Sequence, residues 1–318
     1  MMKKVGHLIL VFLSFFIIAT QVMAAPAQYM AFQKLALYHN DTENKYYLAL
    51  HSIDDSTDLK NLDLDNLHIR LKTKDGVEID VDRKDIIVIP LGDMYAKRDA
   101  EYTFFQFNLV IDTSASIDDS DLRKVNQILT RFVDRLPAPF KAQIIKFSNK
   151  VNKSPFTKDK NQLKRWIAQP YERDMTALHD AIGVAVEELK YVGKKVPLKF
   201  SVIFTDGQDT ASERYKDESY FRNHIISLTS DNAIPLFIVG VGGVNVNLLK
   251  SISRFGHFEH VQNVPDVDKF FDFVGGIING TYIFKIPAVG TLDSLQMIYI
   301  MKKRASGKFT TIQDISVD

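Results

Sequence analysis

The alternation of apolar and polar positions divides the chain into three parts. Residues 25–101 and 281–318 contain short runs in which apolar and polar residues alternate or β-branched residues gather, a pattern typical of antiparallel strands. Between them, over residues 102–280, apolar runs of strand length alternate with segments whose apolar residues recur every three or four positions. This order predicts a parallel sheet with crossover helices. We therefore expect an α/β domain over residues 102–280, with a β-rich segment on either side.

The two β-rich segments are both small. In the first, strands are expected at residues 46–53, 67–72, 77–81 and 86–91, and a loop at residues 54–65. Asp75-Gly76 is a typical hairpin turn between two of these strands. In the second, strands are expected at residues 281–286, 295–302 and 309–312. Because two or three strands do not make a stable domain alone, we predict that residues 281–318 pack with residues 25–101. The α/β domain would then be an insertion in a small antiparallel β domain.

The central part predicts a doubly wound, mostly parallel sheet covered by helices. Its strands are expected at residues 104–111, 143–147, 200–205, 236–241 and 258–261. Its helices are expected at residues 122–136, 162–167, 177–189, 219–228, 247–255 and 267–278. The last helix contains an apolar cluster that we expect in the core: Phe270, Phe271, Phe273 and Val274.

Residues 1–24 have the pattern of a signal peptide. Lys3 and Lys4 precede an apolar run from Leu8 to Ala19, and small residues surround a cleavage position before Ala25. The alternative is a membrane anchor, but the run is shorter than the about 20 residues that a span needs. We expect a mature chain without a membrane span that is exported, either to the periplasm or out of the cell.

The composition narrows the chemistry further. The sequence has no cysteine, which excludes disulfides, thiolate zinc sites and cysteine nucleophiles. An exported chain of 318 residues without cysteine has to be stable through its core alone, which fits a bacterial envelope or secreted protein better than an animal extracellular module. The formal net charge of +1 gives no electrostatic argument for nucleic-acid binding.

Three oxygen-bearing side chains stand where the first strand of the central part ends. Asp112, Ser114 and Ser116 occupy alternate positions directly after the apolar run that begins at Phe107. Residues two apart in an extended segment point the same way, and a short loop brings such side chains to one point. One carboxylate and two hydroxyls make about half of the oxygen shell that a hard divalent cation prefers.

The Asp-x-Ser-x-Ser motif resembles the metal-ion-dependent adhesion site of von Willebrand factor type A domains, the fold shared with integrin inserted domains. The resemblance implies two further metal ligands: Thr176, in a loop before a helix, and Asp206, directly after the strand at residues 200–205. In a doubly wound sheet, such strand ends and loops meet beyond the carboxyl edge. The chain departs from the family at Arg173-Asp174-Met175, where the family usually has glycines, so the shape of this loop is left open.

The charge of this donor set suggests what the site does. Two aspartates neutralise a divalent cation, and three hydroxyls add geometry without charge. Mg²⁺ takes about six oxygen ligands, so at least one position is left for water or for a carboxylate from outside. We therefore expect an exported, non-enzymatic binding protein that captures an Asp or Glu of a protein partner. Mg²⁺ is the expected cation, with Mn²⁺ and Ca²⁺ as alternatives.

Other residues are expected around the ligands. Asp180 and Asp209 are predicted to hold loops or waters near the metal, the alternative being surface or helix-capping carboxylates. The rim that would touch a partner is expected from residues 117–121, 170–175 and 208–219, with Tyr171, Arg214 and Tyr215 as contacts.

Two other classes of function compete with the binding hypothesis. One is a scaffold or assembly subunit of an envelope complex, in which the β domain docks and the metal is structural. The other is a metal-dependent hydrolase, for which the sequence offers no evident general base. The His257 and His260 pair has the spacing of metal ligands, but a strand would direct the two rings to opposite faces, so a structural role is expected.

Overall fold

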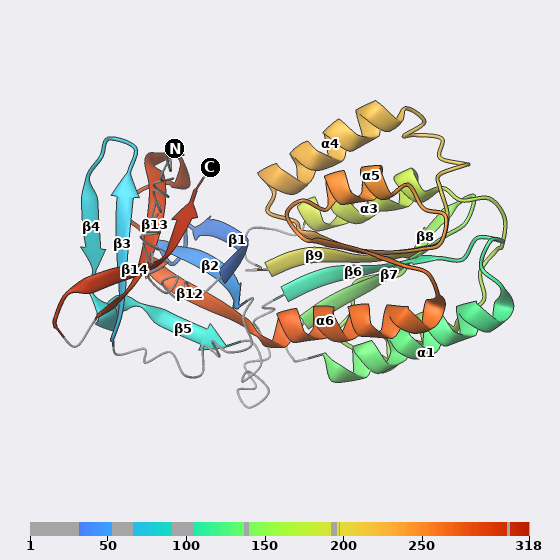
Figure 1. Cartoon of the computed structure of the whole chain (residues 1–318), viewed down its shortest axis with the longest axis horizontal. Helices are drawn as coiled ribbons and strands as arrows, with labels where there is room; N and C mark the ends of the chain where they lie inside the picture. The colour runs from blue at the N-terminus through green and yellow to red at the C-terminus, as the bar shows by residue number, and fades with distance from the viewer. Residues whose placement is uncertain are drawn as a thin grey trace, which may run out of the picture.

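The computed structural model describes residues 32–52, 66–90, 105–136, 140–191, 196, 198–303 and 306–317. The predicted signal peptide, residues 1–24, and most of the loop expected at residues 54–65 lie outside these ranges. Within them, no helix is long and apolar enough to cross a membrane. The described chain forms one six-stranded sheet and two four-stranded sheets (Figure 1).

The six-stranded sheet confirms the predicted α/β class. Its strand order is β11-β10-β9-β6-β7-β8, and all neighbours are parallel except β7 and β8. The strands are β6 (Phe105–Asp112), β7 (Phe140–Phe147), β8 (Val151–Lys153), β9 (Leu198–Thr205), β10 (Leu236–Val241) and β11 (His257–Val261). The short antiparallel edge strand β8 was not predicted.

Helices cover both faces of this sheet (Figure 1). They are α1 (Asp119–Arg135), α2 (Lys160–Ala168), α3 (Leu178–Lys190), α4 (Glu218–Asp231), α5 (Val246–Ile252) and α6 (Val267–Asn279). Apolar side chains of α1, α2 and α6 form one core with one face of the sheet. Those of α3, α4 and α5 form a second core with the other face. The amphipathic spacing that predicted the helices is therefore the spacing that fills the two cores.

Strand β6 lies near the middle of the sheet, hydrogen-bonded to β7 on one side and β9 on the other. All its residues are buried, which explains why its sequence is apolar on both faces. Gln106 and Asn108 are polar exceptions before Asp112, and Asn108 Nδ2 donates to the carbonyl oxygen of Ala185 in α3 at 2.6 Å. This position fixes the end of β6, and with it Asp112, at the centre of the carboxyl edge.

The other two sheets are built from strands of both ends of the chain. One has the order β1-β2-β12-β5 and the other β14-β13-β3-β4. The strands are β1 (Phe32–Asn40), β2 (Lys45–Ser52), β3 (Leu67–Thr73), β4 (Glu78–Val81), β5 (Ile87–Pro90), β12 (Thr281–Pro287), β13 (Leu295–Lys303) and β14 (Phe309–Ser316). β12 pairs with β2 and β5, and β13 pairs with β3, all antiparallel. Buried side chains of both chain ends share one apolar cluster. The division of the chain into domains at residues 102 and 280 stays a prediction.

The two four-stranded sheets together form a β layer. Strand β2 connects this β layer to the central domain. Tyr46, Leu48 and Leu50 belong to the core between the two four-stranded sheets. Tyr47 and Ala49, which alternate with them, pack into the core of α1, α6 and the central sheet. Both faces of β2 are therefore buried, in two different cores, and the β layer is packed against the central domain at the end of the sheet opposite the ends of β6 and β9 (Figure 1).

The prediction that Phe273 of the last helix lies in the core is wrong. Phe270, Phe271 and Val274 are buried, but Phe273 is 40% exposed. The buried stripe of α6 follows the helical period, and Phe273 falls beside it. Its ring packs against the ring of His257, with centroids 4.6 Å apart.

Candidate metal centre

Asp112 is the last residue of β6, and its side chain is held by neutral donors. It is fully buried. Its Oδ1 accepts a hydrogen bond from the backbone N of Ser114 at 2.9 Å. Its Oδ2 accepts one from Oγ1 of Thr205 at 2.6 Å. Thr205 is the last residue of β9, the neighbour of β6, so the two adjacent strand ends together orient the carboxylate.

A chain of hydroxyls leads from this strand end to the second carboxylate. The Oγ atoms of Ser114 and Ser116 are 2.8 Å apart, and Ser116 Oγ donates to Asp206 Oδ1 at 2.7 Å. The loops that follow β6 and β9 are thereby joined side chain to side chain.

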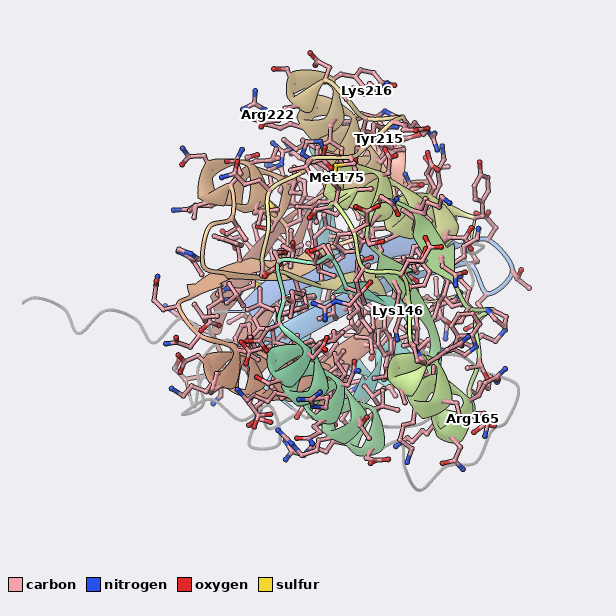
Figure 2. The ribbon with its side chains drawn as sticks, turned by 90° about the vertical axis from the view of Figure 1, so that its right-hand side faces the viewer. Lys146, Arg165, Met175, Tyr215, Lys216 and Arg222 are labelled. Carbon is pink, nitrogen blue, oxygen red and sulfur yellow. The ribbon has the colours of Figure 1, made fainter. Side chains whose placement is uncertain are left out.

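Thr176 completes the group of predicted ligands. A methyl group placed on Gly207 would lie 3.3 Å from Thr176 Oγ1 and 3.8 Å from Ser116 Oγ. The absence of a side chain at Gly207 therefore leaves the space in which these two hydroxyls approach Asp206. All five predicted residues lie together at one end of the sheet. Figure 2 looks onto this end, where Met175, the residue before Thr176, is labelled.

Backbone hydrogen bonds hold the Thr176 loop between its neighbours. The backbone N of Ala115 donates to the carbonyl oxygen of Asp174 at 2.8 Å. The backbone N of Thr176 donates to Thr210 Oγ1 at 3.0 Å, and the backbone N of Thr210 returns a bond to the Thr176 carbonyl at 2.8 Å. These bonds define the loop shape that the sequence Arg173-Asp174-Met175 left open.

The two carboxylates are electrostatically unfavourable without a counter-charge. Burial raises the pKa of Asp112 above its ordinary value. Burial also raises the pKa of Asp206 to about 6, and the negative charge of Asp112 adds to this increase. The nearby guanidinium of Arg173 acts in the opposite direction. Two partly desolvated carboxylates that oppose each other's ionisation are the arrangement that a bound cation relieves.

The donor set fits a hard divalent cation. Two carboxylates and three hydroxyls are oxygen ligands of the kind that Mg²⁺, Mn²⁺ and Ca²⁺ take. Within the ranges that the structure describes, no group of three or more His, Asp or Glu side chains is arranged to hold a metal. A cation bound here would therefore need the hydroxyls of Ser114, Ser116 and Thr176 in addition to the two aspartates.

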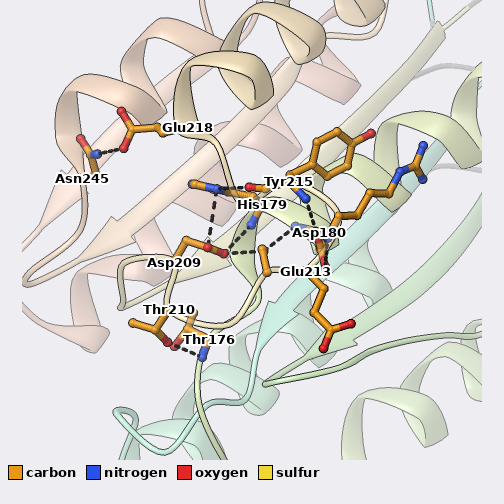
Figure 3. A network of polar contacts seen from close by, with 11 residues as sticks. Thr176, His179, Asp180, Asp209, Thr210, Glu213, Tyr215, Glu218 and Asn245 are labelled. Carbon is orange, nitrogen blue, oxygen red and sulfur yellow. Dashed lines mark hydrogen bonds and ion pairs between the residues drawn. The ribbon is translucent and has the colours of Figure 1, made fainter.

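Asp180 and Asp209 hold the segment 209–215 against the start of α3 (Figure 3). Asp180 accepts hydrogen bonds from the backbone N of Glu213 at 2.9 Å and of Tyr215 at 3.0 Å. Asp209 accepts from the backbone N of His179 at 3.0 Å and from Ser212 Oγ at 2.5 Å. Because this segment also bonds to the backbone of Thr176, both carboxylates support the loop that carries it. Their role around a metal stays a prediction.

The expectation that Tyr215 contacts a partner is wrong, because its side chain is only 1% exposed. Its ring lies over Gly183 in α3, where a methyl group would come within 2.2 Å of the ring carbon Cε2. Arg214 is exposed but forms an ion pair with Glu187. Tyr171 is partly exposed and donates to the carbonyl oxygen of Lys150 at 3.3 Å.

Sequence reasoning missed several residues that position the ligands. The sequence places Thr205 at the end of a strand. A hydroxyl directly before Asp206 could also have indicated a residue that orients a carboxylate of the site. Thr210 and Ser212 follow Asp206 in a polar segment, and nothing in their spacing indicates which backbone they contact. His179 is buried, with Nδ1 3.1 Å from the carbonyl oxygen of Tyr215 and its ring stacked on Phe221.

The family model of the von Willebrand factor type A domain matches residues 108–275, which is more than half of the chain. The chain belongs to this family. Domains of the family commonly mediate protein–protein interaction and adhesion. A comparison with curated proteins finds no similar sequence.

A search of solved structures matches proteins from several organisms. A von Willebrand factor type A protein from Catenulispora acidiphila is 9% identical, with 90% of this chain and 72% of that chain covered and a TM-score of 0.50. Proximal thread matrix protein 1 from the mussel byssus, solved with a zinc-occupied MIDAS motif, is 18% identical with a TM-score of 0.49; the match covers 65% of this chain and half of that one. The von Willebrand factor domain of the type V pili tip protein Mfa5 from Porphyromonas gingivalis is 11% identical, with 56% and 96% covered and a TM-score of 0.47.

Proposed function

We propose that this protein is an exported, non-enzymatic binding protein that captures an acidic residue of a protein partner through a bound divalent cation, most favourably Mg²⁺. The residues that would hold the cation are Asp112, Ser114, Ser116, Thr176 and Asp206. The observation that carries the proposal is the chain of contacts from Ser114 through Ser116 to Asp206 at the carboxyl edge of the sheet, with the Thr176 hydroxyl beside Gly207 and Asp112 at the end of β6.

The charges of the residues support a partner with a carboxylate. Asp112 and Asp206 balance a divalent cation, while the hydroxyls contribute no charge. When bound, the cation would supply a Lewis-acidic position at which a carboxylate replaces water. A site with more carboxylate ligands would keep a net negative charge with the cation bound and would repel an acidic partner.

The surroundings of the site support access by a protein segment. A groove of about 510 Å³ borders Ser116 and Asp206 and runs between the start of α1 and the segment 262–266 before α6. The β layer lies at the opposite end of the central sheet (Figure 1). An extended partner segment that reaches the centre with an Asp or Glu side chain fits this groove better than a small substrate enclosed on all sides.

The histidine and the two carboxylates that lie behind the Thr176 loop in the described structure have structural partners, which supports a non-enzymatic function. His179, the histidine in the segment after Thr176, is used structurally, because its ring contacts Tyr215 and Phe221. Asp180 and Asp209 are engaged with backbone N–H groups and Ser212. These groups therefore serve the loop and are not free to take a proton from water.

Metal titration of the full-length protein tests the proposed ligands. Calorimetric titration with Mg²⁺ and Mn²⁺ is expected to show one site per chain. Asp112→Asn and Thr176→Val should abolish this binding, while Asp293→Asn, a change of an exposed carboxylate next to β13, should leave it unchanged. Unchanged metal affinity in Asp112→Asn would refute the proposal.

Partner capture separates this proposal from a scaffold with a structural metal. A pull-down from the native host, with and without a chelator, should lose the partner when the metal is removed, while circular dichroism shows that the fold is retained. A partner that stays bound in the chelator, and also to Asp112→Asn, would favour the scaffold.

A further inference from the structure

Arg173 lies beside the candidate metal centre, on the segment that leads to Thr176. Its Nη2 donates to the carbonyl oxygen of Ser114 at 3.4 Å, and its Nη1 forms an ion pair with Asp119 in the first turn of α1. The next residue, Asp174, is bonded through its backbone to Ala115. The guanidinium is therefore held next to the loop that carries Ser114 and Ser116.

Metal binding does not explain why a positively charged side chain stands at this position. The positive charge of Arg173 acts on Asp206, whose pKa it lowers, so it lies within Coulomb range of a proposed ligand. A guanidinium at that range repels a divalent cation and attracts an anion. Its presence therefore weakens the affinity for metal alone and favours the approach of a carboxylate.

The contacts of Arg173 leave part of its hydrogen-bonding capacity available. Asp119 is 75% exposed and Arg173 27% exposed, so their ion pair is a surface pair that exchanges at little cost in free energy. Nε of Arg173 is buried and has no hydrogen-bond acceptor in the described part of the chain, so a partner carboxylate would be bound by the Nη groups. A guanidinium has five N–H donors in a planar fork, and that fork matches the two oxygens of a carboxylate.

This inference rests on the proposed function. We propose that Arg173 is a second carboxylate-binding group of the site: it leaves Asp119 and donates to the same partner carboxylate that completes the metal coordination. Arg173 then determines the preference for Asp or Glu over neutral ligands, because it contributes a charge and a direction that the hydroxyls lack.

The competing explanation is that Arg173 has a structural role only: its contacts with Ser114 and Asp119 fix the loop to α1. The two explanations differ at Asp119. If the ion pair only fixes the loop, Asp119→Asn should change acetate binding in the same direction as Arg173→Met. If Arg173 binds the partner carboxylate, Asp119→Asn removes a competitor, and its effect should be opposite to that of Arg173→Met.

The test uses Mn²⁺ as the metal probe and sodium acetate as the carboxylate probe, with sodium chloride at matched ionic strength as the control. The full-length protein is loaded with Mn²⁺, and the loss of bound water on acetate addition is followed by water-proton relaxation. Arg173→Met should weaken acetate binding by about five-fold, the size of a single charge-assisted surface contact. Asp119→Asn should strengthen it, and Arg173→Lys, which keeps the charge but not the fork, should fall between wild type and Arg173→Met.

Each outcome decides the inference. The inference is supported if Arg173→Met and Asp119→Asn shift the acetate midpoint in opposite directions and Arg173→Met binds Mn²⁺ more tightly in chloride. Equal acetate midpoints in wild type and Arg173→Met, or equal effects of the two variants, overturn it and leave the proposed function intact. If wild type binds no Mn²⁺, or binds it as well after Asp112→Asn, both proposals fail. Circular dichroism of each variant in chelator checks that the fold is retained.

Discussion

Ser116 Oγ donates a 2.7 Å hydrogen bond to Asp206 Oδ1, although 90 residues separate the two along the chain. This contact joins the loops that follow two neighbouring parallel strands, β6 and β9. The sheet therefore does more than support the site: its register brings the serine of one loop to the aspartate of the other.

Gly207→Ala should damage the site without unfolding the protein. The added methyl group would lie 3.3 Å from Thr176 Oγ1, closer than an ordinary contact, and near Ser116 Oγ. We expect metal affinity to fall by about ten-fold, as for other changes of groups that orient metal ligands. Stability in chelator should change by no more than about 1 kcal/mol. Calorimetric titration and urea unfolding measure the two quantities.

Gly243→Ala is the matched control, because a methyl group there meets no atom within 4 Å. It lies in the loop after β10, outside the contacts of the five proposed ligands. Equal losses of metal affinity in the two variants would show that the effect of Gly207→Ala does not come from crowding of Thr176.

Thr205→Val should show how much the neighbouring strand contributes to Asp112. The substitution keeps the shape of the side chain and removes the donor to Asp112 Oδ2. A buried carboxylate that loses a hydrogen bond becomes harder to ionise, so we expect the free energy of unfolding in chelator to fall by about 1–3 kcal/mol and metal affinity to fall as well. Thr229→Val, which removes a buried hydroxyl that bonds only to helix carbonyls, should change metal affinity little. A normal metal affinity in Thr205→Val would mean that Asp112 does not need this donor.

Most strands and helices of the central domain were predictable because the spacing of their apolar residues fits only one kind of element. The buried strand before Asp112 and the three- and four-residue spacing of α1 each allow one interpretation. Strand β8, of three residues, exists only because Val151 pairs with Phe147 at the edge of the sheet. The strand β1 was missed because its apolar and polar residues do not alternate regularly, and its place is given by pairing with β2.

The sequence predicts the candidate ligands but not the residues that position them. Asp112, Ser114 and Ser116 share a local pattern, and the family resemblance supplied Thr176 and Asp206. The donation from Thr205 to Asp112 depends on the adjacency of β6 and β9, which no local pattern encodes. Tyr215 was expected at the surface because its neighbours are polar, but the gap that Gly183 leaves on α3 buries it.

Gly183→Ala should destabilise the protein through Tyr215. The new methyl group would come within 2.2 Å of the tyrosine ring, so the ring has to move. We expect a loss of about 2 kcal/mol in the free energy of unfolding, since overpacking outweighs the gain in helix propensity. Because the backbone of Tyr215 bonds to Asp180, the segment that supports Thr176 should shift, and metal affinity should fall too.

Gly275→Ala in α6 is the control for helix propensity. A methyl group at Gly275 meets no atom within 4 Å outside the helix, so this variant should gain about 1 kcal/mol and bind metal normally. If Gly183→Ala were as stable as Gly275→Ala, the packing of Tyr215 against α3 would not matter for stability.

Lys146 gives the protein a pH dependence that does not involve the metal ligands. Its side chain is 5% exposed, and Nζ donates to the carbonyl oxygens of Ile167 and Gln169 at the end of α2. Burial lowers the pKa of Lys146 to about 8 from the ordinary 10.5. Below about pH 8 the amine is charged in both the folded and the unfolded state, and the folded state bears the full cost of the buried charge. As the pH rises from about 8 to about 10.5, the folded protein loses this charge first, and its stability rises.

The comparison with Lys146→Met isolates this contribution, because the methionine has no charge to bury at any pH. Between about pH 7 and about pH 10, the free energy of unfolding of wild type relative to Lys146→Met should rise by about 2 kcal/mol, less than the full shift because pH 10 still lies below the pKa of the unfolded amine. Urea unfolding in chelator at several pH values measures this difference. A difference that stays constant would mean that the two carbonyl oxygens of α2 compensate for burial and keep the amine protonated, and a falling difference would mean that its charge stabilises the fold.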